Sequence, residues 1–111
     1  MFFEPRDYLQ HVLAEAEYLL RESSAVNDAE FLANETLQRE FVRSLEVIGE
    51  ATKQIPDDFR RAHPDIDWRG MGGMRDRLIH GYFGVDYAIV WDVVQNHIPR
   101  VQREIQSILR S

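Results

Sequence analysis

Apolar residues recur at helical spacing along most of this chain. Between residues 6 and 21 they follow one another at steps of three or one, which predicts an amphipathic helix with an inner face at Leu9, Val12, Leu13, Ala16, Leu19 and Leu20. Pro5 suits the first turn of that helix, where its missing N–H costs nothing. A second stripe predicts a helix over residues 34–55, with an inner face at Leu37, Phe41, Val42, Leu45, Ile48 and Ile55.

Breaks and caps divide the rest of the chain. Residues 28–34 are expected to form a short turn, and Pro56 is expected to start a short helix that His63 and Pro64 stop. Asp67 and Asp86 are placed to cap a central helix and a final helix. Trp68 at the start of the central helix is interpreted as a core anchor, and Gly49 in the middle of residues 34–55 as a close crossing between helices.

The final helix carries a long apolar stripe. It runs through Val90, Val93, Val94, His97, Ile98, Val101, Ile105 and Ile108. Pro99 removes the N–H that would bond the carbonyl of Gln95, so a kink is expected there. His97 falls within the stripe and is interpreted as a satisfied or interfacial histidine. These patterns together predict a single all-α domain over residues 1–111, a bundle of four main helices with short connections.

Composition fits a globular protein. The 111 residues are 44% hydrophobic and 29% charged and include no cysteine, so disulfides and thiolate metal sites are excluded. No apolar run reaches the length of a membrane span, and the sequence MFFEPRD lacks the pattern of a signal peptide. We therefore expect a cytoplasmic protein that does not enter the membrane.

Net charge is −6, which argues against indiscriminate binding to nucleic acid. The charge is uneven, however. Residues 59–80 contain five arginines against three aspartates, together with His63 and His80. This local excess is too small to cancel the argument from net charge, but an acidic protein can still bind RNA in a cleft or pair with a basic partner.

Chemistry is concentrated in residues 71–87, MGGMRDRLIHGYFGVDY. Asp76 and His80 are four apart and would share a face of a helix. Arg75 and His80 are separated by about 140° around a regular helix, so they converge only if the helix ends near His80, which Gly81 permits. The alternative is structural: solvated arginines at positions 75 and 77, with His80 as a capping residue at the helix C-terminus.

Residues 75–82, RDRLIHGY, resemble the R-x4-H-x-Y signature of the HepT-like branch of the HEPN superfamily, the toxins of MNT/HepT toxin–antitoxin pairs. The stretches SLEVIGEATKQIPDDFR, HPDIDW and GMRDRLIHGYFGVDYAIVWDVVQNHIP resemble the same family in the same order. The resemblance implies a HEPN-type helical bundle that pairs as a homodimer, with the two motifs in a shared cleft. It also implies a metal-independent endoribonuclease that needs no cofactor.

Roles for the motif residues follow from this resemblance and from their chemistry. His80 would act as general acid or base and Arg75 would stabilise the phosphorane, while Asp76 would orient the imidazole. Tyr82 would receive AMP from a partner nucleotidyltransferase, the antitoxin, with Tyr87 as a nearby alternative. A competing hypothesis is a non-catalytic helical module that docks a nucleotidyltransferase or holds a nucleotide in the same cleft.

Overall fold

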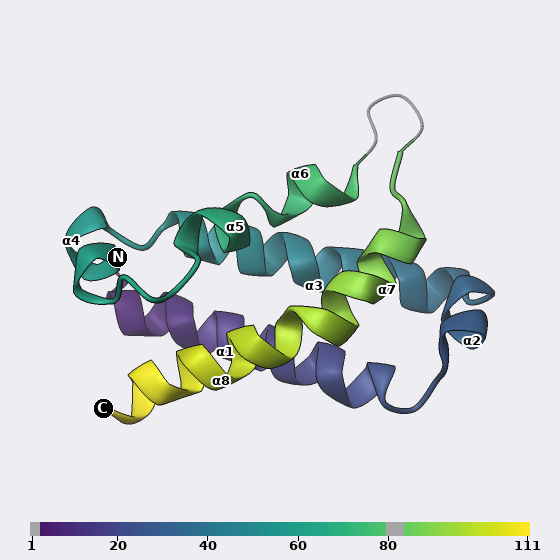
Figure 1. Ribbon diagram of the computed structural model, residues 1–111, viewed down its shortest axis with the longest axis horizontal. Helices are drawn as coiled ribbons and strands as arrows, with labels where there is room; N and C mark the ends of the chain where they lie inside the picture. Colours follow the sequence, from purple (N-terminus) through teal and green to yellow (C-terminus); the bar gives the residue numbers. More distant parts are fainter. Residues whose placement is uncertain (1–2, 80–83) are drawn as a thin grey trace.

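The computed structural model describes residues 3–79 and 84–111 of the chain. Within those residues the regular structure is helical, apart from one isolated β-bridge, which confirms the all-α class (Figure 1). Four helices are long: α1 (Pro5–Ser23), α3 (Glu35–Lys53), α7 (Tyr87–Asn96) and α8 (Ile98–Arg110). Four are single turns or little more: α2 (Asp28–Leu32), α4 (Asp57–Ala62), α5 (Trp68–Gly72) and α6 (Met74–Leu78).

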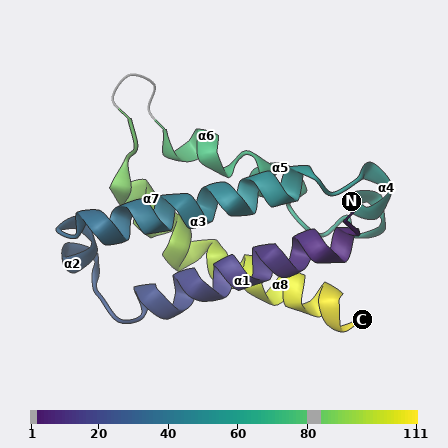
Figure 2. The same ribbon diagram turned by 180° about the vertical axis from the view of Figure 1, so that it is seen from behind.

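The core lies where α1 packs against α3 and α8. Seen from both sides, α1 and α3 run next to each other along the length of the molecule, and α7 and α8 continue one another across them (Figures 1 and 2). The predicted stripes supply the buried side chains, which include Leu9, Val12, Phe41, Leu45, Ile48 and Ile105, each 0% exposed. The hydrophobic pattern therefore identified the inner faces of the long helices correctly.

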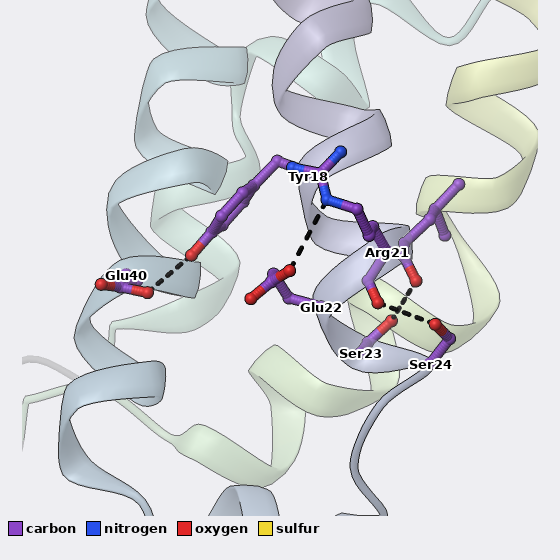
Figure 3. A network of polar contacts seen from close by, with 7 residues as sticks. Tyr18, Arg21, Glu22, Ser23, Ser24 and Glu40 are labelled. Atoms are coloured by element: carbon purple, nitrogen blue, oxygen red, sulfur yellow. Dashed lines mark hydrogen bonds and ion pairs between the residues drawn. The ribbon is translucent and has the colours of Figure 1, made fainter.

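A polar contact ties α1 to α3 at the surface of this core. The Tyr18 hydroxyl donates a hydrogen bond of 2.6 Å to Oε2 of Glu40, and the Arg21 guanidinium lies 5.7 Å from the centre of the Tyr18 ring (Figure 3). Burial of the hydroxyl, followed by its hydrogen bond to Glu40, raises the pKa of Tyr18 from 10.0 to about 12.

The expected final helix is divided into two. Helix α7 ends at Asn96 and α8 begins at Ile98, with Pro99 in the first turn of α8. Because proline lacks an N–H and suits the first turn of a helix, Pro99 starts a new helix here instead of kinking a continuous one. The side chain of His97 is exposed, so its place within a buried apolar stripe was wrong, while an interfacial role stays a prediction.

The central helix is also divided, into α5 and α6, which lie over α3 (Figure 1). The Asp67 carboxylate caps α5 by accepting a hydrogen bond of 2.9 Å from the N–H of Gly70, as predicted. Trp68 is 6% exposed, and its ring N–H donates to the His63 carbonyl at 2.9 Å, which confirms it as an anchor. Gly49 of α3 faces the backbone of α5, where an added Cβ would lie 3.5 Å from the Met71 carbonyl oxygen.

Candidate functional site

Helix α6 holds the first half of the predicted motif. Met74 and Leu78, one turn apart, are 3% and 1% exposed and fasten the helix to the core. The three residues between them that carry charge, Arg75, Asp76 and Arg77, are all exposed. The apolar pair therefore fixes the orientation of α6 and presents the charged side chains to solvent.

The two arginines of α6 differ in direction because they are two residues apart, about 200° around a helix. Neither forms a hydrogen bond or ion pair with any other residue in the part of the chain that the structure describes. No residue among 3–79 and 84–111 therefore occupies the N–H donors of either guanidinium group, and these donors can bind a ligand.

The second half of the motif lies at the edge of the described chain. Helix α6 ends at Leu78, and Ile79 already has extended backbone angles, φ −103° and ψ 124°. Ile79 pairs with Val85 in an isolated antiparallel bridge, and the N–H of Asp86 donates to the Leu78 carbonyl at 2.9 Å. The chain thus leaves α6 and returns to α7 at adjacent points.

His80 and Tyr82 fall between those two points and lie outside the described residues. Asp76 and His80 were expected to share one face of a helix. That expectation was wrong, because α6 ends at Leu78 and Ile79 is already extended. The condition for Arg75 and His80 to converge, a helix that ends near His80, is met. Tyr87, the alternative tyrosine, is half-buried and packs against the core.

The basic stretch of residues 59–80 divides into two kinds of arginine. Arg60 donates from Nε to the Ile55 carbonyl at 3.0 Å and from a terminal nitrogen to the Thr52 carbonyl at 2.9 Å. It thereby satisfies carbonyls at the C-terminal end of α3, where a cation is favourable. Arg61, Arg69, Arg75 and Arg77 are exposed. Of the five arginines counted in this stretch, one therefore stabilises the fold and four are presented to solvent.

A recess opens beside α6 on the side of Arg77. The space in it that water can occupy is about 60 Å³, and it lies between α5 and α6 on one side and the start of α8 on the other. Besides Arg77 it is lined by polar side chains that the sequence analysis did not connect: Asp67, His97, Arg100 and Glu104. Their helical faces were readable from the spacing, but only the break at His97 brings them to α6. A wider groove, between α1 and α3, contains no residue of the motif.

Clusters of three or more histidine, aspartate or glutamate side chains able to hold a metal ion do not occur among residues 3–79 and 84–111. Within the same residues, no helix is both long enough and apolar enough to cross a lipid bilayer.

Known proteins resemble this chain over nearly its whole length. The family described as Ribonuclease HepT-like matches residues 10–108. A protein of Caldanaerobacter subterraneus subsp. tengcongensis, named as a suspected RNase, is 43% identical over 106 residues, which cover 96% of this chain and 95% of the relative. A protein of Thermococcus cleftensis named "Probable ribonuclease HepT" is 40% identical over 103 residues, 93% of this chain and 94% of its own. No solved structure matches significantly.

Proposed function

The chain belongs to the family of HepT-like ribonucleases, and from this premise we propose that it is the toxin of a toxin–antitoxin pair, an endoribonuclease that cleaves RNA without a metal ion. The observation that carries the proposal is the family match over residues 10–108, which includes all of the motif from Arg75 to Tyr82. The exposed position of Arg75 on α6 supports it, because an RNA phosphate has free access to that side chain.

In this mechanism RNA supplies its own nucleophile, the 2′-hydroxyl next to the scissile phosphate. The protein contributes proton transfer and stabilisation of negative charge. Arg75 offers a permanently charged planar donor group that matches two phosphate oxygens. His80 transfers the proton, since an imidazole titrates near neutral pH. Asp76, exposed on the same turn as Arg75, orients the imidazole electrostatically.

A homodimer is part of the proposal for a chemical reason. Cleavage needs one group that removes a proton from the 2′-hydroxyl and one that donates a proton to the leaving 5′-oxygen. A single His80 serves only one of these roles at a time. Two copies of the chain that share a cleft would supply two histidines, one for each role.

Inhibition is proposed to occur at Tyr82. A partner nucleotidyltransferase would transfer AMP from ATP: the Tyr82 oxygen attacks the α-phosphate, pyrophosphate leaves, and the hydroxyl proton is lost. The attached phosphate brings negative charge close in sequence to Arg75 and His80, and the adenine would obstruct RNA. The half-buried position of Tyr87 against the core favours Tyr82 over Tyr87 as the acceptor.

Purified protein with cellular RNA in EDTA tests the catalytic proposal. We expect cleavage to fall about 10²–10⁴-fold in His80→Ala and about 10²–10³-fold in Arg75→Ala. Exposed residues of the same types outside the motif, His11→Ala on α1 and Arg69→Ala on α5, are the controls and should cleave like wild type. Cleavage that persists in His80→Ala, or that stops with EDTA, contradicts the mechanism. RNA that binds without being cut would identify the non-catalytic module instead.

Intact-mass measurement after co-expression with a nucleotidyltransferase of the MNT type tests the inhibition. We expect mass increments of AMP in wild type and in Tyr87→Phe, and none in Tyr82→Phe. Increments that persist in Tyr82→Phe, or an unmodified wild type, would show that the antitoxin acts in another way.

A further inference from the structure

The recess beside α6, defined by Arg77, Asp67, Met71, Met74, Arg100 and Glu104, has a floor and walls of different chemistry. Met71 and Met74, which are 5% and 3% exposed, form the floor together with Val101. The rim is polar and comes from two separate parts of the chain, the α5–α6 segment and the first turns of α8. An apolar floor with a polar rim suits a flat ligand whose faces are apolar and whose edges form hydrogen bonds.

The charges of the rim distinguish between possible ligands. Arg77 and Arg100 contribute two positive charges, and Asp67 and Glu104 contribute two negative charges, so the fixed charges cancel. In this recess the repulsion of a phosphate by two carboxylates offsets its attraction to two arginines, so the recess gains little from binding a phosphate. A neutral nucleobase meets no such penalty, because it offers donors to the carboxylates and acceptors to the arginines.

Both kinds of rim group keep bonding capacity. Arg100 uses Nε for its 2.6 Å ion pair with Glu104, and no described residue bonds its two terminal nitrogens. Asp67 accepts the Gly70 N–H with Oδ1, and no residue in the described part of the chain donates a hydrogen bond to Oδ2. The recess therefore presents guanidinium donors and carboxylate acceptors to the same space.

We propose that this recess binds a guanine base of the RNA substrate next to the site of cleavage, an inference that rests on the proposed ribonuclease function. Guanine is the base with paired groups for both halves of the rim: O6 and N7 accept from an arginine, and N1–H and the N2 amino group donate to a carboxylate. Methionine sulfur packs well against aromatic rings, and arginine planes stack on unpaired RNA bases.

Position connects the recess to the cleavage site. Arg77, in the recess, and Arg75, the proposed phosphate ligand, belong to the same five-residue helix and point to different sides of it. RNA that places a base against Arg77 and a phosphate against Arg75 passes the end of α6 at Leu78, two residues before His80. The recess thereby selects which phosphate reaches the catalytic groups.

Methyl signals of methionine provide a direct binding test that does not depend on cleavage. The chain has three methionines, two of them in the floor of the recess, so the spectrum is simple and Met71→Leu assigns it. Titration with GMP should shift the Met71 and Met74 signals at about tenfold lower concentration than AMP, CMP or UMP. Inorganic phosphate should leave them in place. Equal shifts with all four nucleotides, or shifts with phosphate alone, would overturn the proposal.

Paired variants locate the effect in the rim. Arg77→Ala and Glu104→Gln should each remove the preference for GMP. The exposed ion pair of Arg39 with Glu35 on α3 provides the controls: Arg39→Ala and Glu35→Gln should keep the preference. Arg77 pairs with no described residue, and surface ion pairs such as Arg100–Glu104 and Arg39–Glu35 contribute little to stability, so all four variants should fold. A preference that survives in both Arg77→Ala and Glu104→Gln would overturn the proposal.

Cleavage of short RNAs that differ in a single base separates this inference from the proposed function. Wild type should cut the guanine-containing RNA fastest, and Arg77→Ala should reduce that advantage. Arg75→Ala should bind GMP normally and cut all of them about 10²–10³-fold more slowly. Equal rates of wild type on all four RNAs would overturn the guanine site alone. GMP binding without any cleavage by wild type would overturn the ribonuclease mechanism alone.

Discussion

Helices α3 and α6 lie against each other but differ in almost every physical respect. Helix α3 is 19 residues long, packs on α1, α5, α6 and α7, and buries Phe41, Leu45 and Ile48 completely. Two ion pairs lie within it, Arg39 with Glu35 at 2.7 Å and Lys53 with Glu50 at 3.7 Å. Helix α6 has five residues and two buried anchors, and no described residue pairs with its charges. The comparison assigns stability to α3, and the proposed contacts with RNA lie on α6.

The same difference appears between two arginines. Arg60 gives its donors to backbone carbonyls at the end of α3, whereas Arg75 keeps its donors exposed. Exposed charge that does nothing for the fold is where a binding function can reside without loss of stability. Four substitutions or pairs of substitutions test how sharp this division is.

The largest effect is expected in the core of α3. Ile48→Ala should lower the free energy of unfolding by about 2–5 kcal/mol, because it leaves a cavity at a side chain that is 0% exposed. Arg75→Ala should change it by less than about 0.5 kcal/mol. Urea titrations followed by circular dichroism measure both. A loss in Arg75→Ala comparable to that in Ile48→Ala would show that α6 belongs to the stabilising part of the molecule.

Arg60→Ala should lower the free energy of unfolding by about 1.5–3 kcal/mol, since two carbonyls at the end of α3 lose a charged donor. Cleavage by the protein that remains folded should not change. Arg61→Ala, its exposed neighbour on α4, is the control and should be neutral in both assays. If Arg60→Ala impaired cleavage without changing stability, Arg60 would act in RNA binding or catalysis, as proposed for Arg75.

Two glycines should respond in opposite directions. Gly84 has a φ of +79°, a conformation that costs other residues about 1–2 kcal/mol, so Gly84→Ala should destabilise by that amount. Gly49 is helical, and an added methyl would meet the α5 backbone at an ordinary 3.5 Å. Gly49→Ala should therefore be neutral or gain up to about 1 kcal/mol from helix propensity. Thermal denaturation of the two variants measures the contrast. Destabilisation by Gly49→Ala would mean that the contact between α3 and the α5 backbone is too tight to accept a methyl group.

The smallest effect concerns Tyr18, which lies on α1 away from the motif. Its pKa of about 12 in the folded protein exceeds the unfolded value of 10.0. The hydrogen bond to Glu40 therefore contributes fully below pH 10, and the contribution is lost as the pH rises towards 12. Tyr18→Phe should cost about 1 kcal/mol at neutral pH and should flatten the decline in stability between pH 10 and 12. An unchanged decline in Tyr18→Phe would assign it to other groups.

Much of the fold was accessible from the pattern of apolar residues. The caps Asp67 and Asp86 were identified correctly, because a carboxylate that precedes a helix has few other local roles. Trp68 was correctly placed in the core. The sequence did not predict that the central helix ends and restarts at Gly73 or that the final helix does so at His97. Hydrophobic periodicity is judged over several turns, so it does not reveal a break that occupies a single residue.

The sequence by itself determined the all-α class, the inner faces of the long helices and the membership of the family, because each rests on residue type and spacing along the chain. Tertiary structure decided which charges are free. The sequence does not show that Arg60 and Arg75 differ in role. Arg60 stabilises the fold only because the carbonyls of Thr52 and Ile55, at the end of α3, lie within reach of its guanidinium. Likewise, His97, Arg100 and Glu104 reach the recess beside Arg77 only because α8 starts anew at Ile98, so side chains distant in sequence share one space.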